Sequence, residues 1–431
     1  MTIRAAIRNF KSAWRVGEHV IYPRTPLLST SSPPFKSLHV AHVRDVIDGS
    51  KPNPVAVQMI NYALSHARSQ KSDESYAQGL LILEQCLSSQ TSDADETSKG
   101  MVLLAMSSLL FERGNFDDAT EKLKRIGELP NSALGVQVAA MEALVGLNLE
   151  MGLDDTSSRL ADRGLQLLDS IDKGHASDVL GARIKAIKGL AELAVGNVDS
   201  AESFFPGVGT EKCCAGNVAL SYGELLHVTR KFELAKEIYQ EVIQGLSSSK
   251  DSEDACPLAA CNMSPEHVLS AATCGLGQVE AHLGNFADAE EILTQALTKT
   301  EENFGLHHPR VGVILTCIAL MFRQKSTMEH SSALLVQEGL YRRAIELLKA
   351  PPLDTEGAQT WTMRRDIIAL ARGGYAEVLN VQQNRKDEGE RMKKWAEGAW
   401  RNRRLSLAEA LEVSETSNKV PVVDARIIRV L

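Results

Sequence analysis

The order of apolar and polar residues predicts helices joined by tight turns along most of this chain. In GQVEAHLGNFADAEEIL (residues 277–293), apolar side chains return at helical spacing on both sides of Gly284-Asn285. A glycine inside a helix costs roughly 1 kcal/mol relative to alanine, so the place of Gly277 in the first helix needs a packing reason. Gly284 and Asn285 end that helix, and a second helix begins at once. The stretch is therefore predicted to be a helical hairpin.

The same hairpin pattern recurs, with two small residues twelve positions apart and a turn between them. The clear pairs are Ser107 and Ala119, Gly189 and Ala201, Gly223 and Ala235, and Gly277 and Ala289, with a weaker copy around Ala344. In each clear copy a large apolar residue stands four positions after the second small one: Leu123, Phe205, Tyr239 and Leu293. Small residues let two helices approach closely where they cross, and we expect Phe286 to fill the junction with the next hairpin.

A hairpin of this kind cannot bury its apolar face alone, so neighbouring hairpins are expected to stack. We predict an all-α fold, a right-handed α-solenoid over residues 55–400, followed by a C-terminal tail at 401–431. The steps between hairpins vary from 34 to 55 residues, which predicts seven to eight irregular repeats with insertions. One insertion, residues 247–265, is polar and acidic and is expected to be a mobile loop.

These hairpins resemble the tetratricopeptide repeat (TPR). That repeat has a small residue at its eighth position, an aromatic residue at its seventeenth and alanine at its twentieth, and the hairpins at 107–119, 223–235 and 277–289 fit it. The tryptophan and tyrosine usual in the first helix are mostly absent, so the repeats are degenerate. The resemblance implies a protein-interaction scaffold whose concave groove, lined by the first helices, holds peptides or extended segments.

One known TPR groove binds the acidic tails of heat-shock chaperones through lysine and asparagine at the second and sixth positions of first helices. The corresponding pairs here are Met101 and Ala105, Arg183 and Ile187, Asn217 and Ser221, and Ala271 and Gly275. The lysine and asparagine set is absent, so a chaperone clamp is not predicted.

The first 44 residues differ in charge from the rest. They contain seven lysines and arginines and one acid, Glu18, whereas the whole chain has a formal charge of −8. Four apolar residues share one helical face: Ile3, Ile7, Phe10 and Trp14. A Ser/Thr/Pro-rich stretch follows, and this order predicts a transit peptide at residues 1–44, disordered or a basic amphipathic helix. The mitochondrial matrix is the expected destination; the alternatives are the chloroplast, or a basic tail or membrane-surface helix.

Motifs of common enzymes are missing. The chain has no GxxxxGK[ST], HExxH or GxSxG sequence, so no catalytic residue and no cofactor is predicted. No run approaches ~18 apolar residues, which argues against a membrane-spanning helix. The seven cysteines are scattered and include no CxxC pair, so we expect reduced thiols and no metal site. His308, followed by Pro309, is expected to start a helix.

The region 385–404 is basic and contains two tryptophans. Its candidate docking residues are Lys393, Lys394, Trp395, Trp400, Arg401, Arg403 and Arg404. One interpretation is a docking surface for an acidic partner, a lipid head group or RNA. The favoured one is a last helix with a polar outer face and tryptophans that close the core. The sequence VPVVDARIIRVL (420–431) predicts either a strand-like tail along the solenoid or a short partner-binding segment.

The layout of basic leader, irregular hairpins and basic end is similar to plant mitochondrial TPR proteins of the short-and-swollen-root kind. That resemblance implies a non-enzymatic matrix adapter that supports respiratory or iron–sulfur cluster assembly machinery and root growth, with organellar chaperones or assembly factors as partners. The alternatives are an organellar RNA-associated factor that uses the basic C-terminal helix, and a thiol or metal carrier. The uneven repeat spacing weighs against a repeat that reads one RNA base per unit, so nucleic acid is not the expected partner.

Overall fold

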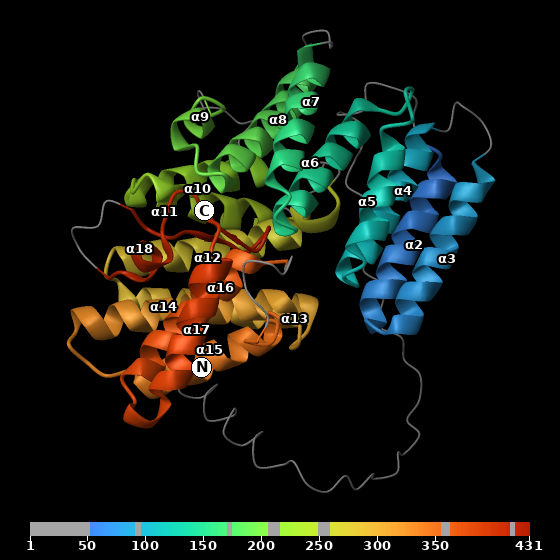
Figure 1. Cartoon of the computed structure of the whole chain (residues 1–431). Helices are drawn as coiled ribbons and strands as arrows, with labels where there is room; N and C mark the ends of the chain where they lie inside the picture. The colour runs from blue at the N-terminus through green and yellow to red at the C-terminus, as the bar shows by residue number, and fades with distance from the viewer. Residues whose placement is uncertain are drawn as a thin grey trace, which may run out of the picture. The chain divides into compact units, whose positions relative to one another are not determined.

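A computed structural model describes residues 52–90, 96–169, 175–205, 216–248, 259–354, 363–413 and 419–431 (Figure 1). Within these ranges the chain forms 17 α-helices, two short 3-10 helices and one two-stranded sheet. They all belong to one compact unit, residues 40–431. The predicted transit segment and Cys213, Cys214 and Cys256 lie outside the described residues.

The helices follow one another as eight pairs. The first four pairs are α2 (Pro54–Gln70) with α3 (Asp73–Ser89), α4 (Glu96–Glu112) with α5 (Phe116–Ile126), α6 (Leu134–Glu150) with α7 (Asp154–Asp169), and α8 (His175–Ala194) with α9 (Val198–Glu202). The next four are α10 (Asn217–Val228) with α11 (Phe232–Ser248), α12 (Pro265–His282) with α13 (Phe286–Phe304), α14 (Pro309–Met328) with α15 (Leu334–Leu347), and α16 (Arg365–Asn380) with α17 (Lys386–Ala399). The remaining elements are η3 (Cys261–Met263), η4 (Gln383–Arg385), α18 (Leu407–Leu411), β1 (Val423–Asp424) and β2 (Arg429–Val430).

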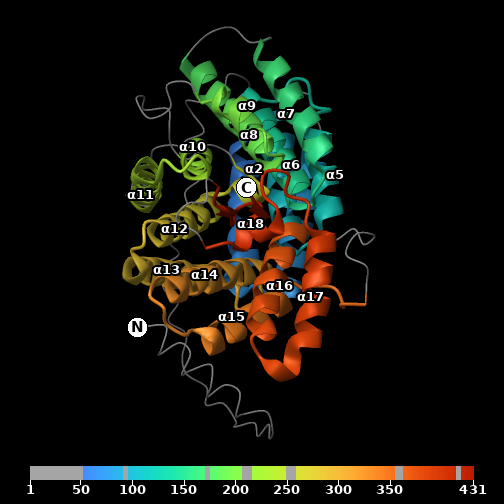
Figure 2. The same cartoon turned by 60° about the vertical axis from the view of Figure 1, so that its left-hand side comes forward.

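Contacts run from each pair to the next. Every helix of a pair touches its partner, and the first helices of successive pairs touch each other from α2 through to α16. The stacking of α12, α13 and α14 is visible in both views (Figures 1 and 2). Because each unit packs against its neighbours in sequence, the described chain is an all-α solenoid, and this prediction is confirmed.

The first helices form an inner layer. Helices α4, α6 and α12 are buried around nearly their whole circumference, whereas second helices such as α5 and α13 bury a single stripe. A helix that is buried around its whole circumference must pack against other elements on opposite sides. The second helices pack on one side of this layer, and residues 420–431, described below, pack on the other side of much of it.

Gly277 makes room for a side chain of the second helix. A Cβ atom at this position would lie 2.6 Å from Cγ of Leu293, and one at Gly223 would lie 2.9 Å from the ring of Tyr239. The small residue of the first helix thus receives the large residue sixteen positions later, while Ala289 is itself fully buried. The weaker helix propensity at Gly277 is offset by this packing.

The predicted turns form as the sequence indicates. Gly284 has a φ of 83°, which favours glycine, and the amide of Asn285 donates to the carbonyl of Glu280 at 2.9 Å. The side-chain amide of Asn285 also donates to the carboxylate of Glu280 at 2.8 Å. His308 caps α14 by accepting from the amide of Arg310 at 3.2 Å, so its predicted helix-start role is confirmed.

The prediction of a mobile loop over residues 247–265 is wrong for its described end, residues 259–264. Ala260, Cys261 and Met263 are buried, and η3 packs against α4, α6 and α12. Gly146 of α6 leaves the space that Asn262 and Met263 fill. Because most of the insertion is polar, its composition predicted a mobile loop, although these few apolar residues pack between inner helices.

Candidate functional site

The inner face of the solenoid is occupied by the chain's own residues 420–431, which we call the groove segment. The inner face means the sides of α6, α10, α12, α14 and α16 that meet this segment, and it corresponds to the predicted concave groove. Strand β1 packs on α12, and β2 packs on α16. The C-terminal end of the chain is seen near α10 and α18 (Figures 1 and 2). Every residue from 422 to 431 is buried.

The groove segment is a small hairpin. Val423 pairs with Val430, and Asp424 pairs with Arg429, in antiparallel register. The amide of Leu431 donates to the carbonyl of Val422 at 2.8 Å. Its aliphatic side chains Val422, Ile427 and Leu431 join the same core cluster as Val145, Leu190 and Leu225 of the inner helices.

Arg426 is the most enclosed charge of the segment, with no exposed side-chain surface. Its guanidinium donates to Glu224 at 2.6 Å, to Asp424 at 2.9 Å and to the hydroxyl of Ser221 at 3.1 Å. It also donates to the side-chain oxygen of Asn217. Burial lowers the pKa of Arg426, but the two carboxylates outweigh burial and raise it.

Burial of this site also affects the pKa of Glu224. Burial raises the pKa of its carboxyl well above the usual range, and Asp424 acts in the same direction, whereas Arg426 opposes both. A carboxylate in this position needs its arginine partner to remain charged. Without Arg426, the carboxyl group of Glu224 would therefore be buried without a cationic partner.

A second arginine of the segment bridges two distant helices. Arg429 donates to Asp154 of α7 at 2.9 Å and to the carbonyl of Leu149 at 3.0 Å. It lies 3.4 Å from the carboxylate of Asp366 on α16. Burial raises the pKa of Asp366, and the charge of Arg429 opposes that shift.

Side chains of the surrounding elements also bind the main chain of the segment. Gln278 of α12 accepts from the amide of Val423 at 2.8 Å and donates to its carbonyl at 2.9 Å, as a neighbouring strand would. Arg310 donates to the carbonyl of Arg426 at 2.9 Å, and Asn402 donates to that of Val430 at 2.6 Å. These side-chain contacts add to the backbone hydrogen bonds within the hairpin itself.

The candidate docking residues of the C-terminal region do not form one surface. Trp395 and Trp400 are buried; Arg372 lies 4.0 Å over the ring of Trp395, and the indole of Trp400 donates to the carbonyl of Leu405 at 2.6 Å. Arg404 donates to the carbonyl of Val420 at 2.6 Å and so holds the groove segment. The four other candidates are exposed: Lys393, Lys394, Arg401 and Arg403.

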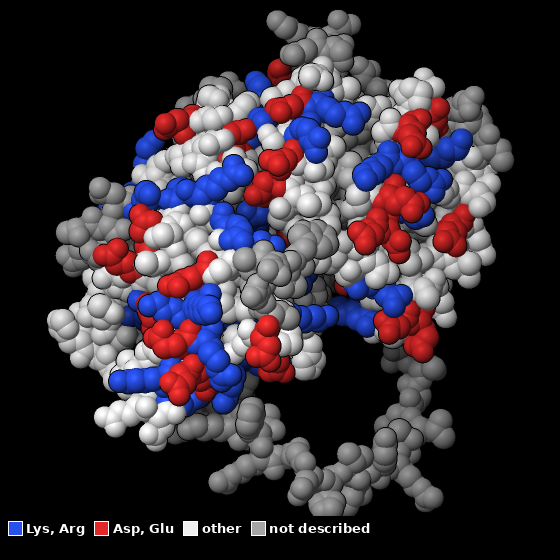
Figure 3. Space-filling model, in the orientation of Figure 1, with Lys and Arg blue, Asp and Glu red and all other residues white. Residues whose placement is uncertain are grey.

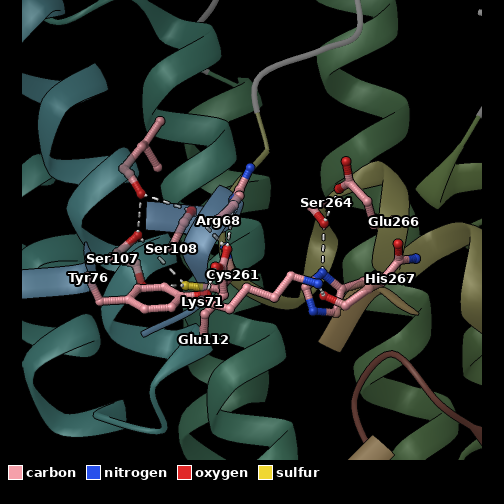
Figure 4. Close-up of polar contacts among 12 residues, drawn as sticks. Arg68, Lys71, Tyr76, Ser107, Ser108, Glu112, Cys261, Ser264, Glu266 and His267 are labelled. Carbon is pink, nitrogen blue, oxygen red and sulfur yellow. Dashed lines mark hydrogen bonds and ion pairs between the residues drawn. The ribbon is translucent and has the colours of Figure 1, made fainter. Parts of the chain in front are cut away.

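A polar cluster joins the first repeats to η3 (Figure 4). Arg68 and Glu112 form an ion pair at 2.7 Å, and the hydroxyl of Tyr76 donates to Glu112 at 2.9 Å. The thiol of Cys261 donates weakly to the carbonyl of Ser107 at 3.7 Å. Burial raises the pKa of Cys261 to about 12, so this thiol is protonated and a poor nucleophile or metal ligand.

A pocket of about 360 Å³ opens beside the groove segment. It lies between α12, α14 and the described residues 410–413 and 419–421, and its lining includes Arg230, His282, Cys317, Arg323, Val420 and Pro421. Cys317 lies 3.6 Å from Cys274, sulfur to sulfur, and the cysteines at 86, 261, 274 and 317 are free and buried. The expectation of reduced thiols stays a prediction.

The described residues contain neither a cluster of potential metal ligands nor a helix that could span a membrane. No group of three or more His, Cys, Asp or Glu side chains is placed to hold a metal ion in the described ranges. None of the helices there combines the length and the apolar character that crossing a bilayer requires. On the face shown in Figure 3, basic and acidic side chains are interspersed.

Comparison with known families supports the repeat. Residues 271–310 match the tetratricopeptide repeat family, which covers most of α12, all of α13 and the start of α14. No curated protein gives a significant match to the chain. The matched hairpin and the solenoid around it are similar to those of TPR-type proteins, a class that typically serves as a non-enzymatic scaffold for protein–protein interaction.

Sequence reasoning missed the partners of Arg426 and Arg429. One signal was present: Asn217 and Ser221, the pair aligned to the groove positions of a first helix, are the residues that Arg426 contacts. The other was the pair of arginines within an otherwise apolar tail. Charged residues are rarely buried without partners, so buried carboxylates could have been sought on the first helices.

Proposed function

We propose that this protein is a non-enzymatic adapter that binds protein partners through the inner face of its solenoid. The observation that supports this function most is the inner face itself, which presents carboxylates, amides and apolar side chains to a segment of the chain. The groove segment shows by example the kind of ligand that such a face accepts. Repeats of this class commonly bind extended protein segments in this way.

We further propose that the adapter works in mitochondria, alongside organellar chaperones or assembly factors. The basic, acid-poor first 44 residues and the layout shared with plant mitochondrial TPR proteins support this placement. That likeness also supports a role with respiratory or iron–sulfur cluster assembly machinery and, through it, in root growth.

The binding function is tested by capture from a mitochondrial extract on the immobilised full chain. We expect specific proteins whose recovered amounts change for the variant Asn217→Ala/Ser221→Ala, because both side chains lie on the inner face. Leu81→Ala is the control, since Leu81 is 54 % exposed on α3 and lies outside that face. Recovery of no protein that responds to the inner-face variant would contradict the proposal.

The placement is tested separately by fusing residues 1–44 to a fluorescent protein. Mitochondrial fluorescence is the expected result, and fluorescence in chloroplasts or the cytosol would refute the mitochondrial destination. This outcome does not depend on the identity of the partner.

A further inference from the structure

We propose that the inner face is a binding site for a short protein segment that folds into a hairpin and carries two arginines three residues apart among aliphatic residues. The groove segment is then a ligand in cis that competes with such a partner. This inference deepens the proposed adapter function and rests on it. The chemistry of the face, together with the occupant it already holds, identifies the class of ligand.

The first arginine subsite is formed by three residues of α10: Asn217, Ser221 and Glu224. Together they offer oxygen acceptors to the guanidinium of Arg426. A guanidinium has five N–H donors in a planar fork, whereas a lysine ammonium has three donors at one point. The spread of these acceptors therefore fits arginine. Glu224 is only 3 % exposed, so an empty subsite leaves a buried acid without a cation.

The second subsite joins helices of the third and the eighth pair. Asp154 begins α7, and Asp366 lies in the first turn of α16; Arg429 lies between them, within 2.9 Å and 3.4 Å of their carboxylates. A ligand must place its second cation three residues after the first to reach this pair. The spacing of the two subsites therefore selects the spacing of arginines in the ligand.

Between the two arginine subsites, side chains of the inner face form hydrogen bonds with the backbone of the ligand. Gln278 binds both the amide and the carbonyl of Val423, and Arg310 binds the carbonyl of Arg426. Contacts of this kind accept any side chain at the contacted residue, as the backbone contacts of strand addition do. The aliphatic side chains of the ligand enter the core cluster that now holds Val422 and Ile427.

The acidic subsites also exclude other classes of ligand. Glu224, Asp154 and Asp366 would repel the phosphates of RNA or of a lipid head group. Glu224 and Asp366 are buried, so solvent screening weakens their repulsion little. A basic protein segment is the class of ligand that compensates these charges. Residues 412–419 connect the groove segment to α18, so a cut within them leaves both subsites intact.

The test uses the full chain with a protease site placed within residues 414–418. A fluorescent peptide of residues 419–431 is added before and after cleavage, and its binding is followed by fluorescence anisotropy. We expect the peptide to exchange into the cut protein and to bind the uncut protein at least about 10-fold more weakly, because the tethered segment has a high effective concentration.

Two altered peptides test the subsites. Arg426→Gln should weaken binding on the order of 100-fold, because it leaves Glu224 buried without a cation. Lys419→Gln removes the same charge from an exposed residue and should change binding less than about 3-fold. Equal binding of the two altered peptides would overturn the proposal.

Failure of the peptide to enter the cut protein, or unfolding of the cut protein when the segment leaves, would also overturn it. The segment would then be an inseparable part of the core. These outcomes are independent of the capture experiment: an adapter that binds its partners elsewhere would still recover proteins from the extract, while the peptide would fail to exchange.

Discussion

Arg426 and Glu224 show how much single buried charges matter to this protein. They lie 2.6 Å apart, and neither is more than 3 % exposed. Breaking such a pair by removing one member is far more costly than the pair is worth as a whole, because the remaining charge stays buried. The sequence contains two arginines in an apolar tail. Glu224 lies 202 residues before Arg426 and Asp154 lies 275 residues before Arg429, so spacing along the chain could not pair them.

We expect Arg426→Ala to lower the free energy of unfolding by about 3–5 kcal/mol. The reason is that Glu224 and Asp424 lose their shared cation. Urea denaturation of the variant and parent measures the difference. Arg403→Ala is the control, because Arg403 is exposed, and should lie within about 0.5 kcal/mol of the parent. Equal stability of Arg426→Ala and the parent would show that Arg426 is not enclosed.

Two buried histidines are expected to make the stability of the protein depend on pH. His227 is fully buried, its Nε2 lies 2.8 Å from Nδ1 of His282, and burial lowers the pKa of both, that of His282 to about 4. A base with a lowered folded pKa stabilises the fold above its unfolded value of 6.5, and this contribution is lost as the pH falls from there towards 4.

The variant His282→Gln should therefore lose less stability than the parent between pH 7 and pH 4. Thermal unfolding midpoints of both proteins, measured across this range, give the comparison. A parallel fall of the two midpoints would contradict the pKa shift. The comparison between proteins is needed because carboxyl groups such as Glu224, whose pKa burial raises, act in the opposite direction.

At the scale of helices and turns, the sequence carried most of the information. The recurring small residues, the Gly-Asn turns and the helix start at Pro309 all form as their local chemistry predicts. The sequence could not show which side chain fills the space at Gly277, because the contact with Leu293 follows from the crossing of two helices. It also missed η3, where a few apolar residues within an acidic insertion find a place between inner helices.

Substitutions at two helical glycines distinguish the effect of helix propensity on stability from the effect of side-chain packing. Gly277→Ala places a methyl group 2.6 Å from Leu293 and should destabilise the fold by about 1–3 kcal/mol. Gly245 of α11 has no atom within 4 Å of the same position and is exposed, so Gly245→Ala should stabilise the fold by about 0.5–1 kcal/mol. Chemical denaturation of both variants tests this, and effects of the same sign would contradict the assigned helix crossing.

At the scale of the whole described chain, the fold class followed from repetition, whereas the occupied inner face did not. Stacked hairpins predict a face lined by first helices, and α6, α10, α12, α14 and α16 provide it. A solenoid has mainly contacts between neighbours, so a segment that bonds to Asp154, Glu224, Gln278 and Asp366 together is outside what repeat patterns predict. The candidate site is therefore non-local, and only the three-dimensional structure brings it together.

The central claim is that residues 420–431 lie within the solenoid and complete its inner layer. Amide hydrogen exchange on the intact protein tests it most directly, because the amide of Val423 donates to Gln278 and that of Leu431 donates to Val422. We predict that the amides of residues 423 and 431 exchange as slowly as those in the middle of α12. Exchange of these amides at the rate of an unstructured peptide would contradict the account.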